Sequence, residues 1–383
     1  MSNNFSPTLP RNRIELLDVL RGLAIVGVLI CNIPFFSGYY YTPFTDLEQM
    51  SLPYLNSALI NIVFSVFLGK FYPILCILFG AGLYMQFAKS KESGFLKFFV
   101  KRMIILLLIG IVHQTIWPGD VVTVYALFAF LLIPFRNLKP KTYLIFAGIM
   151  FVAHFIVTYL DFVFELSGTI NYADNTARIQ YQGVDPLVLL SSVQENGFKG
   201  LLFIVKTQFS YMWTIPRYFK LSPSVAFLFL IGGYLYGSGF LTDKAHKLKY
   251  LLIFLFIGLV GSYLMFYVSY FLKIIGDLFI ALTYISLIAI MMKKRIGYNI
   301  VKGLIPFGRM ALTNYIMQSI ICIIIFYGIG FGNFGKVPLY VIYIIAIFIL
   351  IFQIQFSKYW LRKFQFGPIE GIWRNLSYKR KQN

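Results

Sequence analysis

The first apolar segment of the chain carries three polar side chains at spacings that suit a helix. Asp18 and Arg21 are three residues apart, so a helix places them on one face. Asn32 follows Arg21 by eleven residues, which is about three turns and roughly 16 Å of rise. Ionisable groups inside a spanning helix are costly and usually face a partner or a watery cavity. The segment therefore predicts either a salt-bridged helix packed in a bundle or a helix that lines a polar path.

An apolar segment late in the chain repeats this arrangement. Arg309 comes first, and Asn314 and Gln318 follow four residues apart, on a shared helical face. If both segments enter the membrane from the cytoplasm, each has an arginine at its inner end and amides further out. Together they predict a polar corridor between the cytosol and the exterior.

His113 is the histidine best suited to proton transfer near neutral pH, where imidazole titrates. It lies near the end of a third apolar segment, and Asp120 follows seven residues later. A carboxylate close to the ring would orient it, whereas the alternative is an interfacial histidine hydrogen-bonded to a neighbouring helix. His154, inside an apolar segment, is expected to be structural, and His246, in a basic loop, is expected to be solvated.

The composition is that of a polytopic helical membrane protein. Of 383 residues, 59% are hydrophobic and only 13% are charged, which no soluble globular protein of this size matches. The net charge of +20 comes from Lys and Arg runs between apolar segments, a topology signal and not the basic face of a nucleic-acid-binding protein. The three cysteines lie in apolar segments and predict neither a disulfide framework nor a zinc site.

The sequence predicts an all-α membrane helix bundle of about ten transmembrane helices, both termini cytoplasmic, in one domain over 1–383. Basic runs in alternate connections set this orientation. A long connection at about 161–216 is expected outside the cell, as a lid or a linker, and a basic cytoplasmic tail covers 358–383. An interruption at Gly69 places the start of one span near Phe71. The apolar segments are 16–37, 57–87, 103–117, 121–135, 142–160, 223–241, 250–272, 275–292, 303–328 and 337–357.

Several motifs make the sequence resemble the YeiB-like family of bacterial membrane proteins. They are RIELLDVLRGLA at 13–24, LFGAG at 78–82, GIVH at 110–113, GD at 119–120 with YA at 125–126, GRMALTNY at 308–315 with QS at 318–319, and FGPIEGIWR at 366–374. That family more distantly resembles the transmembrane acyltransferases, which include the lysosomal heparan-glucosaminide N-acetyltransferase and bacterial glycan O-acetyltransferases. Members of the wider group open the first helix with an arginine-glycine pair and carry a polar residue eleven positions after the arginine. Here that residue is Asn32, where many O-acetyltransferases have histidine.

The resemblance implies an acyltransferase that moves an acetyl or other acyl group from cytosolic acyl-CoA to a hydroxyl or amine at the outer face of a bacterial cytoplasmic membrane. Arg21 and Arg309 would bind the phosphates of acetyl-CoA. His113 would take the acceptor's proton, and Asn32 or Gln318 would donate to the oxyanion of the thioester. The other expected site residues are Asp18 and Asn314 beside the donor and Asp120 beside the imidazole.

The partners expected are the acyl-CoA donor, a glycan or cell-envelope acceptor, the lipid bilayer and, in a homo-oligomer, further copies of the chain. No metal and no nucleic acid are expected. Because the sequence offers no nucleophile dyad, direct transfer is favoured over a covalent acyl-enzyme. Two alternatives remain open: a transporter or exporter of a small polar solute, whose midplane polar residues would form its binding site, and a structural subunit of a larger membrane complex.

Overall fold

All regular structure in the described part of the chain is helical. The computed structural model describes residues 13–42, 46–47, 50–117, 119–164, 186–195, 197–212, 215–267 and 273–378. The α-helices are α1 (Glu15–Phe36), α3 (Pro53–Ile62), α4 (Phe71–Phe87), α5 (Phe95–Gln114), α6 (Val122–Leu131), α7 (Pro140–Phe164), α8 (Pro186–Glu195), α9 (Gly197–Met212), α10 (Ile215–Gly237), α11 (Leu248–Tyr267), α12 (Lys273–Lys294), α13 (Tyr298–Arg309), α14 (Ala311–Phe326), α15 (Leu339–Lys363) and α16 (Pro368–Ser377). Short 3₁₀ or π segments are η2 (Tyr39–Tyr41), η3 (Val63–Phe67), η4 (Ile133–Asn137) and η5 (Phe240–Lys244).

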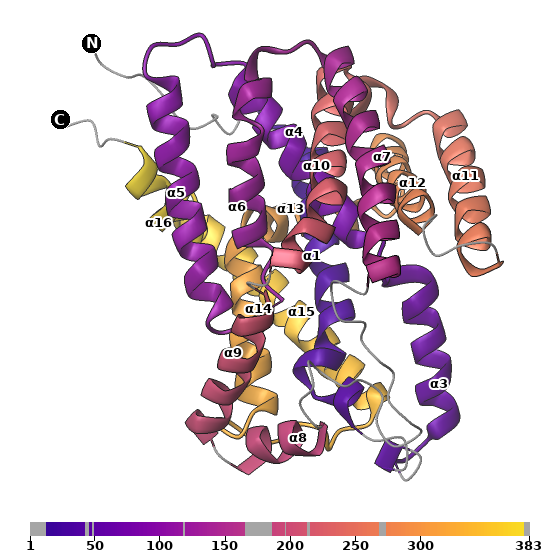
Figure 1. Cartoon of the computed structure of the whole chain (residues 1–383), viewed down its shortest axis with the longest axis vertical. Helices are drawn as coiled ribbons and strands as arrows, with labels where there is room; N and C mark the ends of the chain where they lie inside the picture. The colour runs from indigo at the N-terminus through magenta and orange to yellow at the C-terminus, as the bar shows by residue number, and fades with distance from the viewer. Residues whose placement is uncertain are drawn as a thin grey trace.

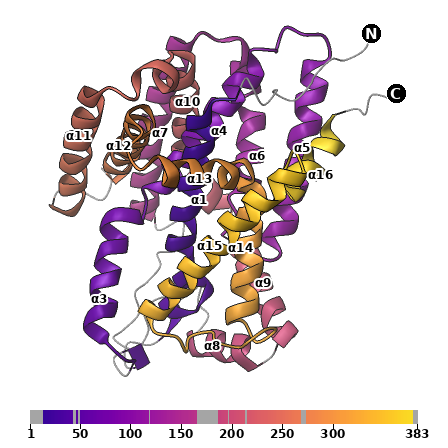
Figure 2. The ribbon, with the colours of Figure 1, turned by 180° about the vertical axis from the view of Figure 1, so that it is seen from behind.

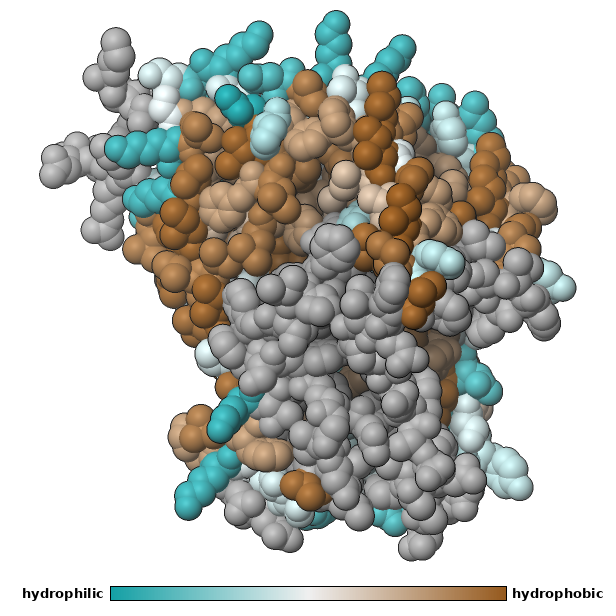
Figure 3. Space-filling model, viewed as in Figure 1, coloured by the Kyte–Doolittle hydropathy of each residue, from teal (hydrophilic) through white to brown (hydrophobic). Residues whose placement is uncertain are grey.

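Five helices of the described chain are long and apolar enough to cross a bilayer, and six if one bent pair counts as a single span. They agree with an all-helical, multi-pass membrane protein, with five or six candidate spans in the described residues where the sequence predicts about ten. Three of the other apolar segments that the sequence predicts contain shorter apolar helices, Val122–Leu131, Pro223–Gly237 and Leu248–Leu264, and the segment at 103–117 lies largely in α5. Figure 3 shows apolar side chains in a broad band over one face, with hydrophilic side chains along its upper edge.

α1 is the central helix of the bundle. It packs against α4, α12, α13, α14 and α15, and Figures 1 and 2 show α5, α6 and α16 to one side of it, with α11 and α12 to the other. Leu20, Ala24 and Ile33 on α1 are completely buried. A helix surrounded in this way needs apolar residues on most of its circumference, which explains why its few polar side chains are confined to the ends.

Two glycines bring α1 and α13 into backbone contact. A Cβ added at Gly308 would lie 1.8 Å from the carbonyl oxygen of Asp18, and one added at Gly22 would lie 2.8 Å from that of Leu304. Small residues permit this close approach of helices in membranes. The arginine-glycine pair of the first helix thus has a packing role. Because Gly22 has no side chain, α13 packs directly against the backbone of α1, and α13 ends at Arg309.

The predicted span at 303–328 is not one straight helix, because the chain bends by 84° between α13 and α14. Met310 separates the two helices, and Figure 2 shows α13 running across the bundle while α14 runs along it. The contact of Gly308 with α1 holds α13 in this transverse direction. Arg309 therefore ends one helix rather than beginning a span. The break predicted near Gly69 is present, and α4 begins at Phe71.

The C-terminal segment is a packed helix for much of its length. α15 extends to Lys363, and α16 then folds back against α5 and α14. Residues 368–377 of the basic tail predicted over 358–383 form this amphipathic helix, which leaves Ile372 and Leu376 exposed. Of the predicted connection at 161–216, residues 165–185 lie outside the described residues, while α8 and α9 form its later part.

A pair of substitutions in α4 tests the helix packing. A Cβ at Gly80 would lie 2.0 Å from the carbonyl oxygen of Phe229 on α10, whereas one at Gly82 would meet nothing within 4 Å. We expect Gly80→Ala to destabilise the protein by roughly 1–3 kcal/mol, the usual cost of overpacking, and Gly82→Ala to leave it nearly unchanged. Thermal unfolding in detergent measures both, and equal effects at the two positions would contradict the packing described.

Candidate functional site

A cavity of about 560 Å³ lies among α1, α4, α5, α6, α14 and α16. This is within the size range of small-molecule sites. Its charged lining consists of five arginines and two carboxylates, namely Arg13, Arg21, Arg102, Arg309, Arg374, Asp18 and Glu370. Its apolar lining includes Leu17, Ile25, Leu75, Leu78, Phe79, Leu83, Met103, Leu106, Val122, Tyr125 and Tyr315. The cavity therefore joins a cationic region to an apolar and aromatic one.

The two carboxylates neutralise the arginines only in part. Arg21 Nη1 donates to Asp18 Oδ1 at 2.8 Å, and Arg13 Nη1 lies 4.0 Å from Asp18 Oδ2. Arg309 Nη2 donates to a backbone carbonyl, that of Gln365, at 3.2 Å. The predicted Asp18–Arg21 pair is thus present, and Arg309 lines the same cavity.

Several buried guanidinium nitrogens have no hydrogen-bond partner within the described residues. They are Arg13 Nε, Arg102 Nε, Arg309 Nε and Arg374 Nη1. A buried donor without a partner costs free energy. An anion in the cavity would supply a hydrogen-bond acceptor to each guanidinium nitrogen that it reaches. Burial and the neighbouring Arg102 lower the pKa of Arg374 to about 10. The positive charges are therefore under-compensated, as in a site for an anionic ligand.

α16 holds the arginine cluster together. The guanidinium of Arg102 stacks on Trp373, 4.0 Å from the ring centroid, and Trp373 Nε1 donates to the Arg102 carbonyl at 2.9 Å. Arg102 also donates to the Tyr378 hydroxyl at 3.2 Å. Stacking on aromatic faces is a property of arginine that lysine reproduces poorly, so these contacts fix the direction of Arg102 beside the cavity.

Glu370 of α16 caps the first turn of α14. Its Oε1 accepts from the backbone N–H groups of Leu312 at 2.8 Å and Thr313 at 3.1 Å, and the Thr313 hydroxyl donates to Oε2. The first N–H groups of a helix lack partners within it, and a carboxylate there also suits the helix dipole. The cap ties the C-terminal helix to the point where the broken span resumes.

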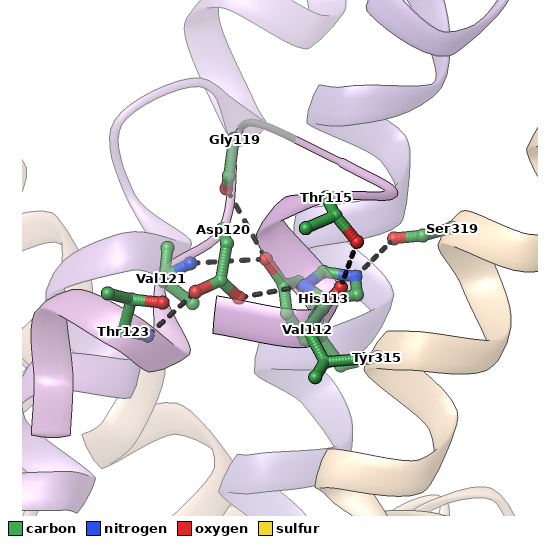
Figure 4. A network of polar contacts seen from close by, with 9 residues as sticks. All are labelled: Val112, His113, Thr115, Gly119, Asp120, Val121, Thr123, Tyr315 and Ser319. Carbon is green, nitrogen blue, oxygen red and sulfur yellow. Dashed lines mark hydrogen bonds and ion pairs between the residues drawn. The ribbon is translucent and has the colours of Figure 1, made fainter. Parts of the chain in front are cut away.

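His113, Asp120 and Ser319 form a buried hydrogen-bonded chain (Figure 4). His113 Nδ1 lies 2.8 Å from Asp120 Oδ1, and His113 Nε2 lies 2.9 Å from Ser319 Oγ. Asp120 Oδ2 also accepts from the backbone N–H of Thr123 at 2.7 Å. A carboxylate only accepts, so Nδ1 carries a hydrogen, and in the tautomer with its hydrogen on Nδ1 the ring accepts from the serine hydroxyl at Nε2.

Tyr315 lies between the cavity and the hydrogen-bonded side chains of His113, Asp120 and Ser319. Its ring lines the cavity and packs 4.9 Å from the His113 ring, centroid to centroid. Its hydroxyl donates to the Gly119 carbonyl at 3.3 Å and accepts from the Val121 N–H at 3.3 Å. Tyr315 thus braces the loop that carries Asp120 and separates the imidazole from the cavity.

The predicted corridor does not continue through the amides of α14. Asn314 Nδ2 donates to the Phe307 carbonyl and to Ser357 Oγ, each at 3.0 Å, and Gln318 Nε2 donates to Gln353 Oε1 at 3.2 Å. Both side chains are buried against α15 and do not line the cavity.

The half-buried Asn32 does not line the cavity either. Of the residues predicted from the sequence, the structure brings Asp18, Arg21 and Arg309 together, and separately pairs His113 with Asp120. The catalytic and donor-binding roles assigned to all of these residues stay predictions.

Sequence reasoning missed Ser319 and the residues of α16. Ser319 is 206 positions from His113 in the chain, so no local spacing links them. The FGPIEGIWR motif at 366–374 was visible and contains Glu370, Trp373 and Arg374, but nothing local indicates that it lines a cavity. Within the described chain, no three His, Cys, Asp or Glu side chains cluster as a metal ion would require.

The fold and the cavity define a multi-pass helical membrane protein with an arginine-lined internal site. The chain belongs to the YeiB-like family of bacterial membrane proteins. It is 31% identical to the uncharacterized protein YxaH of Bacillus subtilis over 98% of this chain and 97% of YxaH. It is 26% identical to the uncharacterized protein YeiB of Escherichia coli over 95% of this chain and 96% of YeiB.

The family model described as "Protein of unknown function (DUF418)" matches residues 235–380, which include α13, α14 and α16. A 39.9 kDa protein from the amylase 3′ region of Bacillus acidopullulyticus is 27% identical over 96% of this chain and 95% of its own length. No solved structure matches the chain.

The cap formed by Glu370 predicts a pH dependence of stability. Burial raises the pKa of Glu370, against the hydrogen bonds from Thr313 and Leu312. Because the folded state then binds the proton more tightly than the unfolded state, stability should fall as pH rises above the ordinary glutamate pKa of about 4.3. Glu370→Gln should remove this component, while Glu92→Gln, at an exposed position, should keep it. Thermal unfolding measured across this pH range compares the variants. Parallel profiles of stability against pH for the wild type and Glu370→Gln would contradict the predicted pH dependence.

Proposed function

We propose that the protein is a membrane acyltransferase that uses acyl-CoA, such as acetyl-CoA, as its donor. The observation that supports this is one cavity with unpaired guanidinium nitrogens at one side and Tyr315, which packs on the His113 ring, at the other. An acyl-CoA has the matching chemistry, with anionic phosphates at one end and a thioester at the end of a long, largely uncharged arm. Small-molecule sites commonly combine an apolar lining with a few polar anchors in this way.

In this proposal the arginines bind the donor's phosphates. Arg102, Arg309 and Arg374 have hydrogen-bond donors to spare, and a planar guanidinium suits two phosphate oxygens at once. The donor's arm lies along Phe79 and Tyr125, and the thioester reaches Tyr315. The Tyr315 ring separates the cavity from His113. The ring must therefore turn aside before the thioester can reach the imidazole.

His113 then acts as the general base. Asp120 accepts from Nδ1–H, so Nε2, which faces the Ser319 hydroxyl, is the ring nitrogen that takes the proton. The Thr123 N–H donates to Asp120, so the imidazole ring is oriented before any substrate arrives and stays oriented when Tyr315 moves. Such preorganisation is the main contribution that a protein scaffold makes to acid–base catalysis.

The acceptor is a hydroxyl or amine of a glycan or another envelope molecule at the outer face. We place both termini in the cytoplasm of a bacterium, with about ten spans, because the Lys and Arg runs favour that side. Arg13 and Arg374 line the cavity near the chain ends, so the donor would enter from the cytosol. His113 lies at the far end of α5, toward the acceptor's side.

Removal of one guanidinium tests donor binding. Arg309→Ala should weaken the binding of acetyl-CoA about tenfold or more, since hydrogen bonds to charged groups contribute roughly 1.5–3 kcal/mol. Arg362→Ala, at an exposed position in the last turn of α15, is the matched control and should bind normally. Isothermal titration calorimetry in detergent measures both. If acetyl-CoA does not bind the wild type, the donor assignment fails and transport of another solute becomes the better reading.

Removal of the imidazole tests the chemistry separately. His113→Ala should lower acetyl transfer by on the order of 10²–10⁴, the usual contribution of a general base, and Asp120→Asn should also lower it by disturbing the tautomer. Transfer of radiolabelled acetyl groups from acetyl-CoA to envelope glycans in membranes measures the effect. Acetyl-CoA binding should persist in His113→Ala, because His113 does not line the cavity. His246→Ala is the control, and a fully active His113→Ala protein would exclude the assignment.

A further inference from the structure

The mechanism proposed above leaves one well-placed group unused, the hydroxyl of Ser319. Its oxygen lies 2.9 Å from His113 Nε2, and Asp120 holds the other ring nitrogen at 2.8 Å. The three side chains come from α14, α5 and the loop after α5 (Figure 4). A hydroxyl, an imidazole and a carboxylate joined in this order are the parts of an activated nucleophile, which recurs on unrelated folds and is recognised by geometry.

We propose that Ser319 carries the acyl group as an ester before the acceptor receives it. This inference rests on the proposed acyltransferase function and replaces direct transfer with two successive transfers.

The other hydroxyls near the site are arranged differently. Thr313 donates to Glu370, and Ser357 accepts from Asn314. Thr123 Oγ1 and Ser286 Oγ have no hydrogen-bond partner within the described residues. In the part of the chain that the structure describes, Ser319 is the hydroxyl whose oxygen faces one ring nitrogen of a histidine whose other ring nitrogen is paired with a carboxylate. Its proton can therefore pass to the imidazole.

The first transfer releases CoA. Ser319 Oγ attacks the thioester carbonyl carbon as its proton passes to His113 Nε2, and the C–S bond breaks when the tetrahedral intermediate collapses. The thiolate takes the proton from the imidazolium and leaves as free CoA. In the second transfer the acceptor oxygen or nitrogen attacks the ester carbonyl, gives its proton to His113, and Ser319 Oγ leaves with that proton. No oxidant or further reactant is needed.

Burial of the three residues suits an ester that must survive until the acceptor arrives. His113 and Ser319 are each 1% exposed and Asp120 is 2% exposed, so bulk water does not reach the oxygen. Water exclusion prevents hydrolysis of a reactive intermediate. The cavity also ends at Tyr315, and a covalent intermediate allows the donor to leave that space before the acceptor is bound. Direct transfer would require both substrates to meet at the imidazole at once.

Acetyl-CoA without any acceptor provides the first test. The purified protein in detergent should release CoA in an amount equal to the enzyme and then stop, and acid-quenched protein should carry one acetyl group on the peptide containing Ser319. Ser319→Ala should lose both and should lower transfer to glycans at least on the order of 10³-fold. Ser286→Ala, at a buried serine on α12 without a neighbouring imidazole hydrogen bond, is the matched control.

Two outcomes separate this inference from the proposed function. If Ser319→Ala transfers acetyl groups within about tenfold of the wild-type rate, as loss of one hydrogen bond of roughly 1 kcal/mol allows, Ser319 only positions His113 and the ester is excluded. If acetyl-CoA neither binds nor acylates the wild type, the proposed donor is wrong.

A fluorophosphonate probe then tests the reactivity of Ser319 independently of CoA. Modification of Ser319 that depends on His113 supports an activated nucleophile, and no modification at Ser319 overturns it.

Discussion

The backbone contact between α1 and α13 is the constraint on which the cavity depends. At Gly22 and Gly308 the two helices approach so closely that any side chain would collide with a carbonyl group. This contact directs α13 across the bundle and ends it beside Asp18, so Arg309 lies in the same cavity as Arg21. In a bilayer, where apolar burial contributes little to helix association, tight packing of small residues is a main source of stability.

A second constraint joins the ends of the chain. The 84° bend leaves the first turn of α14 without a preceding helix, and Glu370 supplies the hydrogen bonds that a continuous helix would have made. The same helix, α16, presents Arg374 and the ring of Trp373 to the cavity. One element therefore completes both the cap of the broken span and the cationic wall, and the two cannot be perturbed independently.

The sequence predicts the contacts that spacing within one segment determines. Helical spacing is sufficient to pair Asp18 with Arg21, whereas the short connection makes Asp120 only a candidate partner of His113, and the structure supplies the contact. The same periodicity correctly places Asn314 and Gln318 on one face, but only packing decides that this face meets Gln353 and Ser357 of α15. The bend at Met310 and the partner of Ser319 depend on contacts between distant segments, which spacing within a segment does not reveal.

The order of the helices in the chain, with α16 after the other helices that line the cavity, has a consequence for biosynthesis. Translation proceeds from the N-terminus, and early segments fold before late ones exist. The helices that hold His113, Asp120 and Ser319 are thus made before the segment that carries Glu370, Trp373 and Arg374. A chain that ends before α16 lacks Glu370, Trp373 and Arg374, so the cavity acquires this part of its lining only after α16 leaves the ribosome and docks.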